Sequence, residues 1–444
     1  MELMVGVSGV RGVVGQTFNP ELVLQFAQAY GTLLGGGPVV LARDSRPSGE
    51  MYALAAAAGL LAAGSQVTDL GIVMTPTVAH AIRTGGYRGG INVTASHNPA
   101  DWNGLKFFDS QGIGPDANQI QRMAAIRTQG AYRLQTEGFG PVKADGDAGP
   151  RHVRAVLDAV EADVSRLKGK TVVLDSVNGA AGPHSRLLLE ALGCRVILLN
   201  AEPTGRFAHP PEPLREHLGS LCTAVREAGA MAGFAQDPDG DRLAVVDECG
   251  EYIGEEYTLA LAAQFVLSRR PGAVAANLST SRLIDDVAAR FGAEVVRTPV
   301  GESNVARAIL EKGCVVGGEG NGGVIDPRLS LVRDSLSAMS LILQLTATTG
   351  KSISRLVADL PRYALIKQKI KCPRDRVDAA VFSVSRAFAE QRLNRTDGVR
   401  IDFPEGWVHL RASNTEPVLR VVAEAAGQAA AESLIRLVRQ AAGL

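Results

Sequence analysis

The sequence predicts an α/β protein. Three related α/β domains, with mixed and largely parallel sheets, precede a C-terminal α+β domain, and all four are arranged around a central cleft. Strand–helix–strand patterns recur three times at separations of roughly a hundred residues, which is typical of α/β domains. The last part of the chain differs, because its strands follow one another as in an antiparallel sheet. At ~100–200 residues per domain, 444 residues fit two to four domains.

Buried apolar runs and alanine- and leucine-rich segments define the three repeated units. Pro-Val-Val-Leu-Ala at 38–42 is such a run, and a turn and an Ala/Leu-rich helix follow it. The first unit has strands at 38–42 and 66–70 with a helix to 63 between them, the second has strands at 170–174 and 194–199 with a helix to 192, and the third has strands at 272–276 and 293–297 with a helix through 290.

The C-terminal unit is predicted to combine an antiparallel sheet with two helices. Its strands are 398–403, 406–412 and 418–424, and its helices are 374–390 and 428–442. A glycine-rich stretch at 138–149, the segment after 247–250 and the segment near 360–362 mark the boundaries. The predicted domains are 1–144, 145–250, 251–361 and 362–444.

Composition is that of an ordinary globular protein, with 46% hydrophobic and 21% charged residues. Basic and acidic residues both number 46, and no basic run is present, so nucleic-acid binding is not expected. No apolar stretch approaches the ~20 residues that cross a bilayer, and no signal peptide is evident. The five scattered cysteines are expected to be reduced. We expect a cytoplasmic protein with no membrane partner.

A serine offers a hydroxyl nucleophile in the segment Thr-Ala-Ser-His-Asn-Pro at 94–99. The segment follows the strand-like residues 91–93, so Ser96 is expected on a loop at the edge of a sheet, where ligands bind in α/β folds. His97 and Asn98 supply polar contacts that can fix the loop. The alternative is an ordinary serine turn at the end of a strand.

Three carboxylates alternate in the segment Asp-Pro-Asp-Gly-Asp-Arg at 237–242, close enough to hold one hard divalent cation. Asp237, Asp239, Asp241 and Glu248 also match positions 1, 3, 5 and 12 of an EF-hand loop. However, Arg242 occupies the position that needs glycine, and the flanks look like strands rather than helices. A solvated hairpin turn is the other alternative.

Together the two segments resemble the α-D-phosphohexomutase family, which moves phosphate between the 1- and 6-positions of hexoses. The resemblance implies that Ser96 is the phosphorylated serine and that Ser96, Asp237, Asp239 and Asp241 bind Mg²⁺. It also implies catalytic roles for Lys106 within the segment Asn-Gly-Leu-Lys-Phe-Phe, for Arg11 within Ser-Gly-Val-Arg-Gly, and for His97. A hexose 1,6-bisphosphate is the implied intermediate and activator. The resemblance also implies a role for each predicted domain: the first carries the phosphoserine, the second binds the metal, the third recognises the sugar and the fourth binds phosphate.

A third segment, Gly-Glu-Gly-Asn-Gly-Gly at 318–323, satisfies the dinucleotide fingerprint, but no helix is expected after it. In the family it corresponds to the sugar-recognition loop, where Glu319 binds sugar hydroxyls beside Asn321. The commonest bacterial version has Ser at the position of Asn321 and His at that of Gly323, so the function of that His is missing here. Residues 301–304 correspond to another sugar-facing loop, and Arg242 is expected to face the transferred phosphate.

The fourth segment is Arg-Ala-Ser-Asn-Thr-Glu-Pro at 411–417, followed by Arg420. Hydroxyls, backbone N–H groups and guanidinium groups in one loop can cradle a phosphate. The resemblance assigns the distal phosphate of the substrate to this loop. Its predicted ligands are Arg411, Ser413, Asn414, Thr415 and Arg420.

These segments predict a phosphohexomutase that acts through phosphorylated Ser96. The chain suits the phosphoglucosamine mutases of the family, and it suits the phosphomannomutase/phosphoglucomutases nearly as well. A metal-dependent sugar phosphatase and a non-catalytic sugar-phosphate-binding protein are the alternatives of another class. The expected partner is a small hexose phosphate, and the expected assembly is a monomer or a homodimer.

Overall fold

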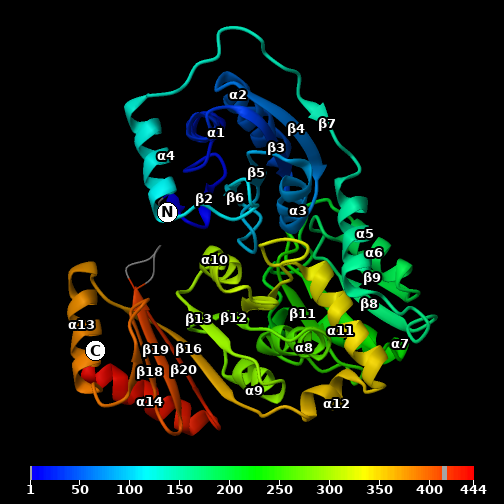
Figure 1. Ribbon diagram of the computed structural model, residues 1–444, viewed down its shortest axis with the longest axis vertical. Coiled ribbons are helices and arrows are strands. Elements are labelled where there is room, and N and C mark those ends of the chain that lie inside the picture. The colour runs from blue at the N-terminus through cyan, green and yellow to red at the C-terminus, as the bar shows by residue number, and fades with distance from the viewer. Residues whose placement is uncertain (1–2, 413–417) are drawn as a thin grey trace.

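The computed structural model describes residues 3–412 and 418–444, which form four sheets with helices packed against them. Figure 1 shows the sheets following one another around an arc. In that view the first sheet lies at the top, the second at the lower right, the third at the lower centre and the fourth at the lower left. Among the described residues, no helix is both long and apolar enough to cross a membrane.

The first sheet has seven strands in the order β1-β2-β6-β5-β3-β4-β7. The pairs among β5, β3, β4 and β7 are parallel, and those among β1, β2, β6 and β5 are antiparallel. The strands are β1 (Met4–Gly6), β2 (Gly9–Val13), β3 (Gly37–Arg43), β4 (Ser65–Ile72), β5 (Gly89–Val93), β6 (Trp102–Phe108) and β7 (Lys143–Ala144), and the helices are α1 (Pro20–Leu34), α2 (Gly49–Ala62), α3 (Thr75–Gly85) and α4 (Ala117–Gln129).

The second and third sheets have four strands each, in the orders β11-β10-β8-β9 and β13-β12-β14-β15. The second unit contains β8 (Thr171–Asp175), β9 (Arg195–Leu199), β10 (Ala232–Gln236), β11 (Leu243–Val246), α5 (Ala148–Val160), α6 (Gly182–Ala191), the 3₁₀-helix η1 (Arg215–His217) and α7 (Gly219–Ala228). The third contains β12 (Val274–Asn277), β13 (Val295–Thr298), β14 (Val316–Glu319), β15 (Gly323–Ile325), α8 (Glu255–Arg269), α9 (Leu283–Arg290), α10 (Glu302–Lys312), α11 (Ser335–Thr349) and α12 (Ile353–Ala358).

The three units share one topology. In each, a strand, a helix, a parallel strand, a second helix and a third strand are followed by an antiparallel strand that closes a hairpin. The hairpins are β5–β6, β10–β11 and β14–β15. Their loops carry the serine segment, the aspartate segment and the sugar segment, respectively. The serine, aspartate and sugar segments therefore occupy equivalent positions in three copies of one repeated fold.

One hydrophobic core runs through the second and third units, from Val153 to Leu360, and also includes Met74 of the first unit. Helix α11 is buried along most of its length and packs against both α5 and α8. Asp334 caps this helix by accepting a hydrogen bond from the N–H of Leu336. Arg333 directly precedes this cap, so it lies at the start of a helix that belongs to the cores of both units.

The fourth sheet is antiparallel throughout, with the strand order β16-β20-β19-β18-β17. Two helices pack on it over a separate core. The elements are β16 (Ala364–Lys371), α13 (Arg374–Ala387), β17 (Arg392–Asn394), β18 (Val399–Asp402), β19 (Gly406–Ala412), β20 (Val418–Ala425) and α14 (Gln428–Ala441).

The predicted fold class is confirmed, and the predicted strands of the repeated units lie within two residues of β3, β4, β8, β9, β12 and β13. The sequence did not predict β1, β2, β7, β16 or β17. Strand β16 contains Lys367, Lys369 and Lys371, and it lies at the edge of its sheet, where charged strands are common. The domain borders after residues 144, 250 and 361 stay predictions.

Candidate active site

The three hairpin loops meet at a cavity of 380 Å³. Residues of the N-terminal hairpin and of β20 in the fourth unit complete its wall. Of the residues predicted as functional, the cavity is lined by Arg11, Ser96, His97, Lys106, Arg242, Glu319, Asn321 and Arg420. Sequence segments that lie up to several hundred residues apart thus form one site.

Ser96 lies on a strained loop. Its φ of 52° is in the left-handed region, which costs a non-glycine residue energy. The guanidinium of Arg46 stabilises this conformation because it donates to the backbone carbonyls of Ser96 and Asn98, both at 2.7 Å. It also donates to those of Pro99 and Trp102. Arg46 is fully buried and pairs with Asp44 at 3.1 Å. Its hydrogen bonds to the loop carbonyls therefore fix the backbone at Ser96.

The Ser96 hydroxyl lies between a carboxylate and an imidazole. It donates to Asp237 Oδ2 at 3.2 Å, and His97 Nδ1 is also 3.2 Å away. Burial, together with the charges of Arg242 and Arg11, lowers the pKa of His97 well below its usual value. The imidazole is therefore neutral near pH 7 and can accept a proton.

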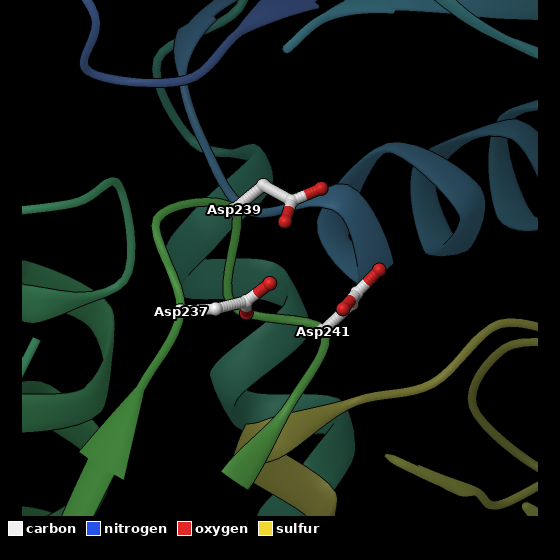
Figure 2. Close-up of side chains that lie close together, drawn as sticks. All are labelled: Asp237, Asp239 and Asp241. Atoms are coloured by element: carbon white, nitrogen blue, oxygen red, sulfur yellow. The ribbon is translucent and has the colours of Figure 1, made fainter. Parts of the chain in front are cut away.

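The three aspartates extend from the β10–β11 loop toward one another, as Figure 2 shows. All three are fully buried, and each contributes an oxygen within 4.8 Å of the others. Asp239 Oδ1 and Asp241 Oδ1 are buried but have no hydrogen-bond partner among the described residues. At 2.0–2.1 Å per bond, adjacent oxygens around Mg²⁺ are about 2.9 Å apart and opposite ones about 4.1 Å, so this cluster would contract to hold the ion. These residues fit a hard divalent cation.

The strands flanking this loop exclude an EF-hand, which requires helices. Glu248, which would be its bidentate ligand, instead accepts hydrogen bonds from the backbone and hydroxyl of Ser354. It belongs to no group of potential metal ligands in the described chain.

The positive charges of Lys106 and Arg333 offset the negative charges of the buried aspartates. Lys106 Nζ lies 2.6 Å from Asp239 Oδ2 and 2.9 Å from Asp241 Oδ2, and Arg333 lies 2.7 Å from the same Asp241 oxygen. Burial raises the pKa of Asp241, but Arg333 and Lys106 outweigh it and hold the pKa well below its usual value. Burial lowers the pKa of Lys106, but Asp239 and Asp241 outweigh this and raise it. Lys106 is therefore a fixed positive charge beside the serine in this state.

Asp237 contacts neither of these two cations. Burial raises its pKa well above the usual range, and the charges of Asp241 and Asp239 raise it further. Its Oδ1 accepts the backbone N–H of Arg242 at 3.1 Å. The Arg242 guanidinium pairs with Glu212 at 2.8 Å and lies 3.5 Å from His97 Nε2, at the rim of the cavity.

Arg11 reaches the cavity from β2. One of its terminal nitrogens donates to Asn98 Oδ1 at 3.4 Å, while its buried Nε has no partner among the described residues. Burial lowers the pKa of Arg11 from its usual value. A half-buried guanidinium that lines the cavity, with its terminal nitrogens bound only at 3.4 Å, is suited to bind an oxyanion.

Glu319 is held on several sides at the end of β14. Its Oε1 accepts from Asn277 at 2.9 Å and from the N–H of Gly301 at 3.2 Å. Its Oε2 accepts from Arg333 at 2.7 Å and from Asn321 at 3.4 Å. A strand, β15, follows this loop, so the structure excludes the dinucleotide-binding alternative, which requires a helix.

Arg333 lines the cavity, and no sequence motif indicated it. It is about nine-tenths buried and pairs with Asp241, Glu302 and Glu319 at 2.7 to 2.8 Å. It thereby links the aspartate loop to both sugar-facing loops. A Cβ on Gly323 would lie 2.0 Å from Arg333 Cδ, so this arginine occupies the space that a side chain at 323 would need. The glycine at 323 and Arg333 are therefore structurally coupled.

The predicted phosphate cradle is partly described. Arg420 lines the central cavity. Arg411 lines an adjoining cavity of 240 Å³ and pairs with Asp397 at 2.9 Å. Ser413, Asn414 and Thr415 lie outside the described residues.

The chain matches four family models over nearly its whole length. They are the phosphoglucomutase/phosphomannomutase alpha/beta/alpha domains I, II and III, at residues 2–133, 150–250 and 254–363, and the C-terminal domain of the same family, at residues 366–441. The chain belongs to the α-D-phosphohexomutase family. Members of this family are isomerases that transfer phosphate within a hexose.

Several relatives are similar over most of their length. A probable phosphoglucosamine mutase of Methanopyrus kandleri is 37% identical over 97% of this chain and 95% of its own. A phosphoglucomutase/phosphomannomutase of Thermococcus kodakarensis is 37% identical over 98% of both chains. A solved phosphoglucomutase/phosphomannomutase family protein of Burkholderia thailandensis superimposes with a TM-score of 0.86, at 30% identity and 99% coverage of this chain and 98% of that one.

Proposed function

We propose that this phosphohexomutase interconverts glucosamine 6-phosphate and glucosamine 1-phosphate through phosphorylated Ser96. The observation that carries the mechanism is the contact of the Ser96 hydroxyl with the buried Asp237, at the wall of a cavity that Lys106, Arg11 and Arg420 also line. Support for the amino sugar comes from the relatives named phosphoglucosamine mutase. The phosphoglucomutase/phosphomannomutase name of another relative supports the alternative substrates, glucose and mannose phosphates.

In the proposed reaction, phosphorylated Ser96 donates its phosphoryl group to the free hydroxyl of the bound sugar phosphate. The bond from phosphorus to Ser96 Oγ breaks and a bond to the sugar oxygen forms. The sugar hydroxyl loses a proton and Ser96 Oγ gains one, and neutral His97, 3.2 Å from Ser96 Oγ, is the group proposed to pass it on. Lys106 and Arg11 stabilise the charge on the phosphoryl oxygens. The product is a hexose 1,6-bisphosphate, whose other phosphate returns to Ser96 after the intermediate has turned over.

Arg420 and the 411–415 loop are proposed to hold the phosphate that is not reacting. That role requires the fourth domain to open and close while the intermediate turns over, which is a gating step. A hydrolase needs no second phosphate anchor, so the phosphatase alternative leaves Arg420 in the cavity without a function.

Catalytic efficiency measured for glucosamine, glucose and mannose phosphates tests the substrate. We expect glucosamine phosphate to be preferred and isomerised sugar phosphate to exceed released inorganic phosphate. A preference for mannose or glucose phosphate would contradict the amino-sugar assignment and leave the mutase mechanism intact. Release of inorganic phosphate without isomerised sugar would instead support the phosphatase.

Mg²⁺ is the cation that we propose for the aspartate cluster, where it would neutralise phosphoryl oxygens. A chelator should abolish turnover, and excess Ca²⁺ should inhibit it because that ion prefers longer and looser coordination. Asp239→Asn removes one anionic ligand, so Mg²⁺ affinity measured by calorimetry should fall at least about tenfold.

Glu248→Gln is the matched control, because Glu248 is bound to Ser354 and does not face the cluster. It should leave Mg²⁺ affinity unchanged. Full activity in a chelator, or Ca²⁺ that replaces Mg²⁺ without loss, would show that the metal assignment is wrong.

A further inference from the structure

A second cavity, of 480 Å³, lies between the third unit and the C-terminal unit and shares no lining residue with the active-site cavity. The third unit lines it with the N-terminus of α8 and the start of α9, and the fourth unit lines it with β16 and β20. Tyr252, Tyr257 and Tyr363 contribute aromatic rings to its wall. No step of the proposed reaction uses this cavity.

Two carboxylates from different units meet in it. Glu256 Oε2 accepts the backbone N–H of Ser281 at 3.0 Å, and Glu424 Oε1 accepts that of the next residue, Arg282, at 2.9 Å. The two carboxyl groups therefore bind the same short segment just before α9, near enough for the charge of Glu424 to raise the pKa of Glu256.

Each carboxylate leaves one oxygen unused. Glu424 is fully buried, and its Oε2 has no hydrogen-bond partner among the described residues; the same is true of Glu256 Oε1. The lysine in the wall, Lys367, pairs with Glu255, and Arg282 lies 3.6 Å from the other oxygen of Glu424. Two adjacent buried carboxylates repel each other unless a cation or a shared proton lies between them.

The pKa of Glu256 reflects its burial beside a second carboxylate. Burial raises it to about 8, Lys367 opposes the rise, and Glu424 adds to it. A cation bound at the free oxygens would offset the cost of burying the two carboxylates.

We propose that this cavity binds a small organic cation with a primary ammonium group, held by Glu256 Oε1 and Glu424 Oε2. An ammonium has three N–H donors, which suits two unused carboxylate oxygens and one further acceptor. Aromatic walls favour organic cations. A metal ion is a poorer fit, because it needs about six oxygen ligands, and the described residues offer only one cluster of three close ligands, the aspartates of the active site.

The cavity also contacts the sugar loop. A Cβ on Gly320 would lie 2.0 Å from Glu256 Oε2, so the Glu256 carboxylate packs directly against the backbone between Glu319 and Asn321. A cation bound to Glu256 would therefore lie next to the sugar loop, on the side that faces the second cavity. Bound to Glu424 as well, it would connect the fourth unit to the third. We expect it to change KM for the sugar phosphate.

Isothermal titration calorimetry of the full chain with 1,4-diaminobutane, in saturating Mg²⁺, tests the proposal, with uncharged 1,4-butanediol as the matched control. We expect the diamine to bind and the diol not to bind. Glu424→Gln and Glu256→Gln should each weaken diamine binding at least about tenfold, since each removes a charge paired with the ammonium. Thermal unfolding of the unliganded variants checks that they are folded.

Glu255→Gln, in the same wall but already paired with Lys367, should weaken binding much less. Asp239→Asn should bind the diamine like the wild type. Binding that is lost in Asp239→Asn and kept in Glu424→Gln would place the diamine in the active site and overturn the proposal. No binding to the wild type would also overturn it and leave the two carboxyl groups sharing a proton. Because binding is measured directly, failure of the proposed mutase reaction would not affect this result.

Discussion

Replacing Ser96 by alanine is expected to lower mutase turnover by about 10³-fold or more, because no other hydroxyl would carry the phosphoryl group. The hydroxyl donates to the buried Asp237, and the fully buried Arg46 fixes the loop through backbone carbonyls rather than through the Ser96 side chain. The variant should therefore keep its fold. Turnover is measured as conversion of sugar 6-phosphate to sugar 1-phosphate.

Mass spectrometry after incubation with glucose 1,6-bisphosphate gives a second readout. The wild type should gain one phosphate on Ser96, and Ser96→Ala should gain none. Ser303→Ala is the matched control, since it removes a hydroxyl from the wall of the same cavity and should still be phosphorylated on Ser96. If Ser96→Ala retains most of its turnover, the phosphoserine mechanism is wrong.

The predicted site residues that lie together in the structure share one property: each belongs to a short motif of neighbouring residues. Ser96 follows a strand end, and the aspartates alternate within five residues, so each motif can be recognised without its partners. The hairpin loops then bring the motifs together, because each motif occupies the same position of a repeated fold. The repeated strand–helix–strand units predicted the sheets but not this equivalence, since the predicted units did not include the antiparallel strand that closes each of them.

Arg46 and Arg333 show what could not be predicted. Each is a single arginine without a motif, and its function depends on partners far away in the sequence. Arg46 donates to carbonyls 50 or more residues away, and Arg333 contacts Asp241 from a distance of 92 residues. Only the fold reveals such contacts. The sequence shows that Gly323 departs from the common family pattern. Only the structure shows that Arg333 occupies the space that a side chain at 323 would need.

The second large effect is expected at Arg333. Its guanidinium donates through Nε to Glu302 and through its two terminal nitrogens to Glu319 and Asp241. A lysine keeps the charge but cannot reproduce the planar fork that reaches three separate loops. Losing a partner of a buried charge network costs about 2–5 kcal/mol, so Arg333→Lys should lower kcat/KM for the sugar phosphate about 10²-fold.

This loss should appear mainly in KM, because Arg333 positions Glu319 for the sugar rather than contacting Ser96. The response to Mg²⁺ separates a positioning role from general damage. Arg333→Met removes a cation that touches Asp241, so Mg²⁺ affinity measured by calorimetry should rise while KM for the sugar phosphate also rises. Simple disruption of the site would weaken both ligands together.

Two further variants complete this test. Gly323→Ala places a Cβ against Arg333 Cδ and should raise KM in the same direction as Arg333→Lys, although the substitution adds no charge. Arg328→Met is the matched control, because Arg328 pairs with Asp326 outside the cavity, and it should leave KM unchanged. If Arg333→Lys and Gly323→Ala both bind sugar phosphate like the wild type, Arg333 does not position the sugar loop, and Asn277, Asn321 and the N–H of Gly301 are enough to hold Glu319.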